Sequence, residues 1–348
     1  MKSGWKAIGT TRLRALCLIS AAAALFGLAQ TEPTIRVDVR LVRILATVKD
    51  AAGQLTGDLA KGDFAVTDNG APQAIAVFER QTETPLSVAI LIDTSGSTAK
   101  DLRYEVDSVN RFARALIRQG NAGDAAALYS FNWEVVKQQS FTRNTLAIDR
   151  ALRLLHGEAG TSLYDSILLA SRDIQDREGR RVLIVVTDGG DTVSRSRFDQ
   201  AVEAAQLADT VIYPVLVVPI AGDAGRNTGG ENALTTFAER TGGRVFAPTV
   251  GAAMDKAFEQ ILRDLRTQFL IGYYPHNVPL TKDRFHRLGV SVNRTGHRVA
   301  ARSGYYGEAL DDTRAPGSAP GGVGSRPLDE TIRQQKPVAP AAKKGRGP

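Results

Sequence analysis

The chain has 348 residues, 43% of them hydrophobic, which is enough for about two domains with substantial cores. Its formal charge of +7 comes from the two ends. Residues 1–29 carry four basic side chains and no acidic one, and residues 311–348 carry seven basic side chains against four acids. Residues 30–310 are therefore neutral overall, which excludes nucleic acid as the expected partner of the folded part.

The first 29 residues are typical of an export signal. A basic stretch ends at Arg14, the apolar run ALCLISAAAALFGLA follows, and small residues precede Gln30. The apolar run is short for a membrane span, so we expect no stable span after cleavage, with an uncleaved anchor as the alternative. The only cysteine, Cys17, lies in this segment, which fits an exported chain without disulfides. We expect the protein in the periplasm or outside the cell.

Residues 30–84 predict an N-terminal β segment. From Thr34 to Leu41 apolar residues alternate with charged ones, which indicates a half-buried strand. A turn is expected at residues 50–53. Two further strands are predicted around Asn69-Gly70, a strong hairpin signal.

The pattern changes at Pro85. The runs SVAILI, RVLIVV and VIYPVLVV are continuous apolar strands, as in a parallel sheet covered by helices on both faces. Between and after them lie amphipathic helices, one beginning near Lys100 and one containing Met254. Residues 85–266 therefore predict an α/β domain with a doubly wound, mostly parallel sheet.

After Thr267 the period of two returns, with QFLIGYYP, a strand around Val290, a turn at Thr295-Gly296 and RVAARSGYY. We expect residues 267–310 to complete one sandwich-like β module with residues 30–84, so that the α/β domain is inserted in this module. The alternative is two separate β appendages flanking the domain. Residues 311–348 are rich in Pro, Gly and Ala and are expected to be disordered.

Polar side chains follow three elements of the α/β domain. Asp93, Ser95 and Ser97 come directly after the strand SVAILI, Thr161 precedes a helix, and Asp188 follows the strand RVLIVV. Ligands bind outside the carboxyl ends of the strands in open α/β sheets, so we expect these loops to share one edge. Asp191 is interpreted as a turn residue and Asp165 as a first-turn helix residue.

Several chemistries fit these loops poorly. A serine nucleophile lacks both the G-x-S-x-G elbow and a nearby base, since all four histidines lie outside the loops. Zinc is disfavoured by the lack of cysteine and of paired histidines, and no phosphate-binding Gly-x4-Gly-Lys motif occurs. A simple helix cap by Ser95, Ser97 or Thr98 stays open as an alternative.

A hard divalent cation fits better. Mg²⁺ prefers six oxygen ligands, usually one or two carboxylates with neutral oxygens and water. Asp93, Ser95 and Ser97 alternate in one loop, so their side chains can point to one side, and Thr161 and Asp188 can complete the set. The sequence thus indicates a cation site.

The run DTSGS is the D-x-S-x-S signature of the metal-ion-dependent adhesion site, and the domain resembles a von Willebrand factor type A domain. By this resemblance Thr161 matches the family's threonine and Asp188 its second aspartate. The resemblance implies a mostly parallel sheet with one antiparallel edge strand and an ion above it. The order of segments over residues 34–306 is similar to exported A-domain proteins of the Acidobacteria, although Thr98 stands where many relatives carry a hydrophobic residue.

We therefore expect a non-enzymatic, exported binding protein. Mg²⁺, or Mn²⁺, or less readily Ca²⁺, is held by Asp93, Ser95, Ser97, Thr161 and Asp188 and binds an acidic group of an unidentified protein partner. Two alternatives remain open: an envelope scaffold in which the ion only stabilises the fold, and a hydrolase that uses Asp93 or Ser95.

Overall fold

The structure is a computed structural model that describes residues 41–80, 84–98, 101–218, 228–279 and 284–307. The predicted export signal, most of the strand expected at residues 34–41 and the C-terminal tail lie outside these residues. No helix in the described ranges is long and apolar enough to cross a membrane.

The α/β domain is built on a five-stranded sheet with the strand order β7-β6-β5-β8-β9. Four strands are parallel and only the edge strand β7 is antiparallel to its neighbour β6. This confirms the predicted fold class. The strands are β5 (Leu86–Asp93), β6 (Ala125–Phe131), β7 (Val135–Thr142), β8 (Arg180–Thr187) and β9 (Thr210–Leu216).

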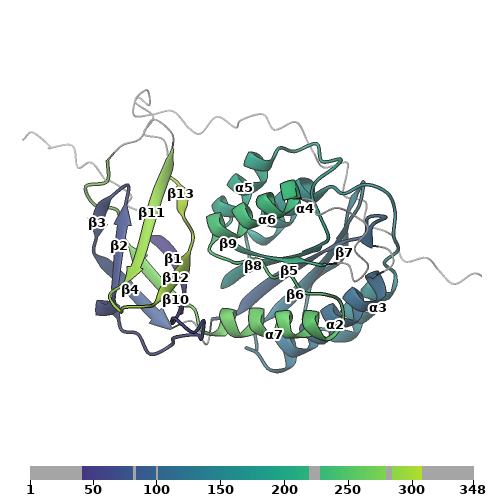
Figure 1. Ribbon diagram of the computed structural model, residues 1–348, viewed down its shortest axis with the longest axis horizontal. Coiled ribbons are helices and arrows are strands. Elements are labelled where there is room, and N and C mark those ends of the chain that lie inside the picture. The colour runs from purple at the N-terminus through teal and green to yellow at the C-terminus, as the bar shows by residue number, and fades with distance from the viewer. Residues whose placement is uncertain (1–40, 81–83, 99–100, 219–227, 280–283, 308–348) are drawn as a thin grey trace, which may run out of the picture. The chain divides into compact units, whose positions relative to one another are not determined.

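Six helices of the described chain cover the two faces of this sheet, with α2, α3 and α7 on one face and α4, α5 and α6 on the other (Figure 1). Their bounds are α2 (Leu102–Arg118), α3 (Thr145–Arg153), α4 (Leu163–Ile174), α5 (Phe198–Leu207), α6 (Thr228–Thr241) and α7 (Ala252–Arg266). All eight residues of the central strand β5 are buried, because helices lie against both of its sides.

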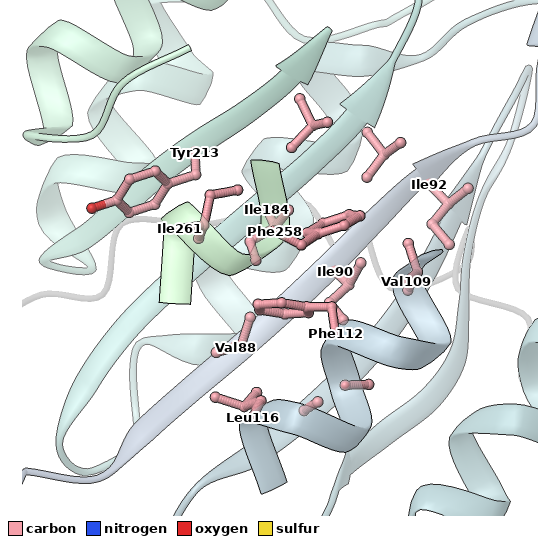
Figure 2. Close-up of a cluster of buried hydrophobic side chains, with 14 of the residues drawn as sticks. Val88, Ile90, Ile92, Val109, Phe112, Leu116, Ile184, Tyr213, Phe258 and Ile261 are labelled. Atoms are coloured by element: carbon pink, nitrogen blue, oxygen red, sulfur yellow. The ribbon is translucent and has the colours of Figure 1, made fainter. Parts of the chain in front are cut away.

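The helices α2 and α7 pack their apolar faces against the sheet and against each other. Successive turns of α2 present Leu116, Phe112 and Val109 to the strand β5 (Figure 2). Phe112 also packs on Phe258 of α7, with the ring centroids 5.0 Å apart. The apolar stripe predicted from the sequence is thus the buried face of α2.

The β module consists of two four-stranded antiparallel sheets, ordered β12-β1-β10-β4 and β13-β11-β2-β3. Each sheet joins strands from before and after the α/β domain: β1 pairs with β10 and β12, and β2 pairs with β11. The strands are β1 (Val42–Lys49), β2 (Phe64–Asp68), β3 (Ala71–Gln73), β4 (Ile75–Arg80), β10 (Phe269–Tyr273), β11 (Phe285–Val292), β12 (Arg298–Ala301) and β13 (Gly304–Tyr306), with a 3₁₀ turn η1 (Lys61–Asp63) before β2.

One hydrophobic core lies between the two sheets of the module. Phe64 of β2 packs on Phe78 of β4 and Phe269 of β10, with ring centroids 5.4 and 5.2 Å apart. The predicted hairpin at Asn69-Gly70 is present between β2 and β3, and both residues have positive φ, as a tight hairpin turn requires. The two β segments are therefore interleaved in space, whereas the exact domain boundaries stay a prediction.

Two strands of the α/β sheet were not predicted individually from the sequence. The strand β6 is AAALYSF, whose alanines give a weak strand signal, although all seven residues are buried. The edge strand β7 is mostly half-buried and carries Lys137, Gln138 and Gln139, so its pattern is neither continuous nor alternating. The resemblance to the A domain implied this antiparallel edge, but the residue pattern did not.

Candidate functional site

Asp93 is the last residue of the central strand β5, and its side chain is fully buried. One carboxylate oxygen accepts a hydrogen bond from the backbone N–H of Ser95 at 2.8 Å, and the other accepts one from the Thr187 hydroxyl at 2.6 Å. Both donors are neutral, and Asp93 forms no ion pair within the described residues. Burial therefore raises the pKa of Asp93 to about 6. The nearby charge of Asp188 also raises it, whereas the hydrogen bonds from Thr187 and Ser95 lower it.

The loop after Asp93 holds two serine hydroxyls side by side. The Oγ atoms of Ser95 and Ser97 lie 3.1 Å apart. Ser95 is buried, whereas Gly96 and Ser97 are exposed, so the loop is open to solvent on one side. The Thr98 hydroxyl donates to the carbonyls of Asp93 and Ser95, at 3.0 and 2.9 Å. Thr98 thus ties the loop to its own backbone, and the helix α2 begins only at Leu102.

Hydrogen bonds join the three polar loops to one another. The N–H of Thr94 donates to Phe131 at the end of β6, and the N–H of Ser162 donates to Asn132, the next residue. Thr161 then bonds to Thr192 in both directions: its N–H donates to the Thr192 hydroxyl and its carbonyl accepts from the Thr192 N–H, each at 2.9 Å. The hydroxyl of Thr187, the last residue of β8, donates to Asp93 and so joins the third loop to the first. The carboxyl edge of the sheet is therefore one connected polar surface.

The two remaining predicted ligands are Thr161, which belongs to this hydrogen-bonded network, and Asp188, which directly follows Thr187. Thr161 is 7% exposed and lies two residues before α4, whose N-cap is Ser162. Asp188 is half-buried, directly after β8, and its charge acts on Asp93. Among the described residues no group of three or more His, Cys, Asp or Glu side chains is close enough to hold a metal ion together. The predicted set contains only two carboxylates, so this observation does not test it.

Two other acids of these loops act on the backbone. Asp191 accepts hydrogen bonds from the N–H of Tyr164 at 3.2 Å and from the N–H and hydroxyl of Ser194. Asp165 lies in the first turn of α4 and accepts from the N–H groups of Arg195 and Ser196, at 3.0 and 2.9 Å. Both residues hold the loop after β8 against the start of α4, in agreement with their interpretation as turn and helix residues.

The loop after β8 packs closely against a glycine of the helix α6. A Cβ atom added to Gly230 of α6 would lie 2.5 Å from the backbone N of Gly190. The backbones of α6 and of the loop therefore approach so closely that no other side chain fits there without a shift. This contact fixes the loop that carries Asp188.

Sequence reasoning missed Glu105, which the structure places on the buried face of α2. The residue is fully buried, and its electrostatic neighbours include Asp93 and Asp188. A signal was present, since Glu105 follows Leu102 by three residues and precedes Val109 by four, within an otherwise apolar stripe.

His156, the histidine nearest to these loops in sequence, contacts other residues than the serines. Its ring contacts Glu158, with Nε2 3.3 Å from the carboxylate, and the side chain is 70% exposed. The hydroxyl of Ser95 lies beside that of Ser97, and a hydrogen bond from the Ser95 side chain also lowers the pKa of Asp93. The arrangement therefore offers clustered oxygen atoms rather than a serine paired with a histidine base.

Comparisons with known proteins agree with this architecture. Residues 88–191 match the family model described as von Willebrand factor type A domain. No curated protein is significantly similar to the chain.

Several solved structures resemble about half of the chain. The vWF domain of the type V pili tip protein Mfa5 from Porphyromonas gingivalis is 16% identical, with 53% of this chain and 97% of that one covered and a TM-score of 0.44. The conserved hypothetical protein BatB from Bacteroides thetaiotaomicron is 22% identical, with 52% and 98% covered and a TM-score of 0.40. The PilB minor pilin from Streptococcus sanguinis is 13% identical, with 54% and 63% covered and a TM-score of 0.41.

The family match runs from Val88 within β5 to Asp191 in the loop after β8. It therefore covers the part of the fold that forms the polar edge described above. This chain contains a von Willebrand factor type A domain.

Proposed function

We propose that this chain is a binding protein whose A domain holds a divalent cation and uses it to bind an acidic group of a protein partner. The proposed ligands are Asp93, Ser95, Ser97, Thr161 and Asp188, and the proposed ion is Mg²⁺ or Mn²⁺, with Ca²⁺ less suitable. The observation that carries the proposal is a buried carboxylate without an ion pair, placed beside two convergent serine hydroxyls.

The spacing of the serine hydroxyls suits a small cation. In an octahedral site with ligands at about 2.1 Å, neighbouring oxygen atoms lie about 3 Å apart. The Oγ atoms of Ser95 and Ser97 are 3.1 Å apart. Both hydroxyls can therefore serve as adjacent ligands without a change of the loop.

The charges of the site also favour a cation. A buried carboxylate is costly unless a positive charge or several donors compensate it. The hydrogen-bond donors to Asp93, from Ser95 and Thr187, are neutral, and Asp188 adds a second negative charge instead of a positive one. A dication would balance these two charges.

The open side of the site is where a partner would reach. Ser97 and Gly96 are exposed at the carboxyl edge of the sheet. Ser, Thr and Asp side chains supply five ligands at most in monodentate coordination, so a sixth octahedral position stays available. When bound, the ion supplies a Lewis-acidic position for a carboxylate of the partner, and the chain's own residues only hold and orient it.

The proposal leaves out catalysis, since His156, the histidine nearest to these loops in sequence, contacts Glu158. The scaffold alternative differs from the binding function in one respect: it needs no partner at the ion. Proximity labelling in the native host, comparing wild type with Asp93→Ala, is expected to show partners that the variant loses. If wild type still captures a partner in the presence of EDTA, and Asp188→Ala captures it equally well, the scaffold alternative is favoured instead.

A further inference from the structure

Glu105 is an acidic residue within the apolar face of the helix α2. Its neighbours on that face are Leu102, Val109 and Phe112, all buried, and Glu105 itself is 0% exposed. An ionisable side chain in such a place is rare in proteins unless it has a partner.

Neither carboxylate oxygen of Glu105 has a hydrogen-bond partner among the described residues. Other buried acids of the same domain are fully paired. Asp264 of α7 is 2% exposed and accepts from Arg244 at 2.6 Å, and the buried Asp124 accepts from the N–H groups of Leu86 and Asn121, both at 2.8 Å. Buried polar groups are nearly always satisfied, so the lack of a partner at Glu105 calls for an unseen one.

The packing of α2 places Glu105 at the level of the cation site. In Figure 2 the side chains of Leu116, Phe112 and Val109 follow β5 from Val88 through Ile90 to Ile92. One helical turn beyond Val109 comes Glu105, and one residue beyond Ile92 comes Asp93. Burial raises the pKa of Glu105 to about 8, and the charges of Asp93 and Asp188 act in the same direction, in agreement with this placement.

We infer that Glu105 is a positioning residue of the cation site, whose carboxylate supplies a third negative charge beside Asp93 and Asp188. The inference rests on the proposed function. Since no three acidic or histidine side chains of the described chain are close enough to share a metal ion, Glu105 acts through its field or through an ion-bound water. The same charge repels an acidic ligand, so Glu105 favours retention of the cation over capture of the partner.

Stability alone gives no reason for a carboxylate at this position. An apolar residue of similar volume would fill the face of α2 without an unsatisfied polar group. A residue kept for the cation should therefore show two opposite effects when it is replaced: weaker cation binding, and no loss of stability in the metal-free protein.

The test uses the full chain and Mn²⁺ as the probe, with binding measured by isothermal titration calorimetry and melting measured in EDTA. Glu105→Gln and Glu105→Leu are expected to bind Mn²⁺ about tenfold more weakly than wild type, the lower end of the loss typical for residues that support metal ligands. Both variants should melt in EDTA at the wild-type temperature or above it. Asp264→Asn is the matched control: it should melt at a lower temperature and bind Mn²⁺ as wild type does.

The outcomes separate the two proposals. If wild type binds Mn²⁺ and both Glu105 variants bind it within twofold of wild type, Glu105 has no role at the site and the proposed function stands. If either variant melts well below wild type in EDTA or does not fold, Glu105 is a structural residue and the inference fails. If wild type itself binds no Mn²⁺, the proposed function and this inference both fail.

Discussion

Two carboxylates at the carboxyl edge of the sheet, Asp93 and Glu105, are buried without an ion pair in the described part of the chain. At a pH between the unfolded and the folded pKa, such a group is mostly protonated in the folded protein and mostly ionised in the unfolded chain. They therefore give the metal-free protein a pH dependence opposite to that of ordinary paired carboxylates.

We expect the metal-free protein to lose stability as the pH rises. The pKa of Asp93 is raised from 3.8 to about 6 and that of Glu105 from 4.5 to about 8, so the folded state binds more protons than the unfolded state between these values. The stabilising contribution is complete below about pH 4 and disappears through pH 8. Between pH 6 and 8 Glu105 dominates and contributes at most about 1.4 kcal/mol per pH unit.

Urea denaturation in EDTA at several pH values measures this dependence. The Glu105→Gln variant should have a flatter curve than wild type between about pH 5 and 8, and a similar curve below about pH 4, where Glu105 is protonated in both the folded and the unfolded state. Parallel curves for the two proteins over the upper interval would show that Glu105 is already ionised in the folded state.

The sequence predicted the polar residues of the loops but not the residues that contact or surround them. Asp93, Ser95 and Ser97 could be grouped by their spacing alone, since alternate residues after a strand share a side. Thr187 and Glu105 could not be assigned in the same way, because the first depends on which strand lies beside β5 and the second was overlooked within an apolar stripe.

The elements of the β module are joined across its two sheets by a buried polar cluster. The Asp68 carboxylate of β2 accepts hydrogen bonds from the hydroxyls of Tyr273 of β10 and Tyr305 of β13, at 2.7 and 2.8 Å. His286 of β11 lies 3.1 Å from the same carboxylate through its Nδ1 and stacks on Tyr305. Tyr273 and Tyr305 therefore anchor a buried acid in addition to packing in the core of the module.

Replacing Tyr273 by Phe should destabilise the β module. The change removes one donor from a fully buried carboxylate, and an unsatisfied buried group typically costs about 1–3 kcal/mol. The matched control is Tyr274→Phe, because Tyr274 is 53% exposed and surface substitutions usually change stability by no more than about 0.5 kcal/mol. Chemical denaturation compares the two variants, and equal stabilities would show that Asp68 does not need the Tyr273 hydroxyl.

The molecule as a whole is built by interleaving. The strand β1 has its partners in β10 and β12, the strand β4 has its partner in β10, and β2 pairs with β11. Every one of these pairings crosses the length of the A domain in sequence. The five strands of the A domain, in contrast, pair only among themselves.

Removal of residues 267–348 should therefore unfold the N-terminal β segment and leave the A domain folded. The strands β1 and β4 would keep none of their described partners, and a lone β2-β3 hairpin is marginally stable in water. Hydrogen exchange followed by mass spectrometry should show residues 42–80 unprotected and the strands from β5 to β9 protected. Retained protection of residues 42–80 would mean that this segment folds on its own.

Sequence patterns predicted the large-scale plan because they change sharply, from alternating to continuous apolar strands at Pro85 and back after Thr267. They could not supply the strand pairing inside the β module. Alternation shows which face of a strand is buried but not which strand lies beside it, and β1 pairs with residues more than 220 positions away.

The central claim, a divalent cation held at Asp93, is tested most directly by melting the full chain in EDTA and with Mg²⁺ or Mn²⁺. A ligand at about 100 times its dissociation constant stabilises the folded state by about 2.7 kcal/mol, or roughly 5–10 °C in melting temperature for a unit the size of the A domain. We predict such a shift for wild type and for Asp199→Ala, whose carboxylate is 64% exposed on α5, and none for Asp93→Ala. No shift for wild type, or an equal shift for Asp93→Ala, would contradict the proposed cation site.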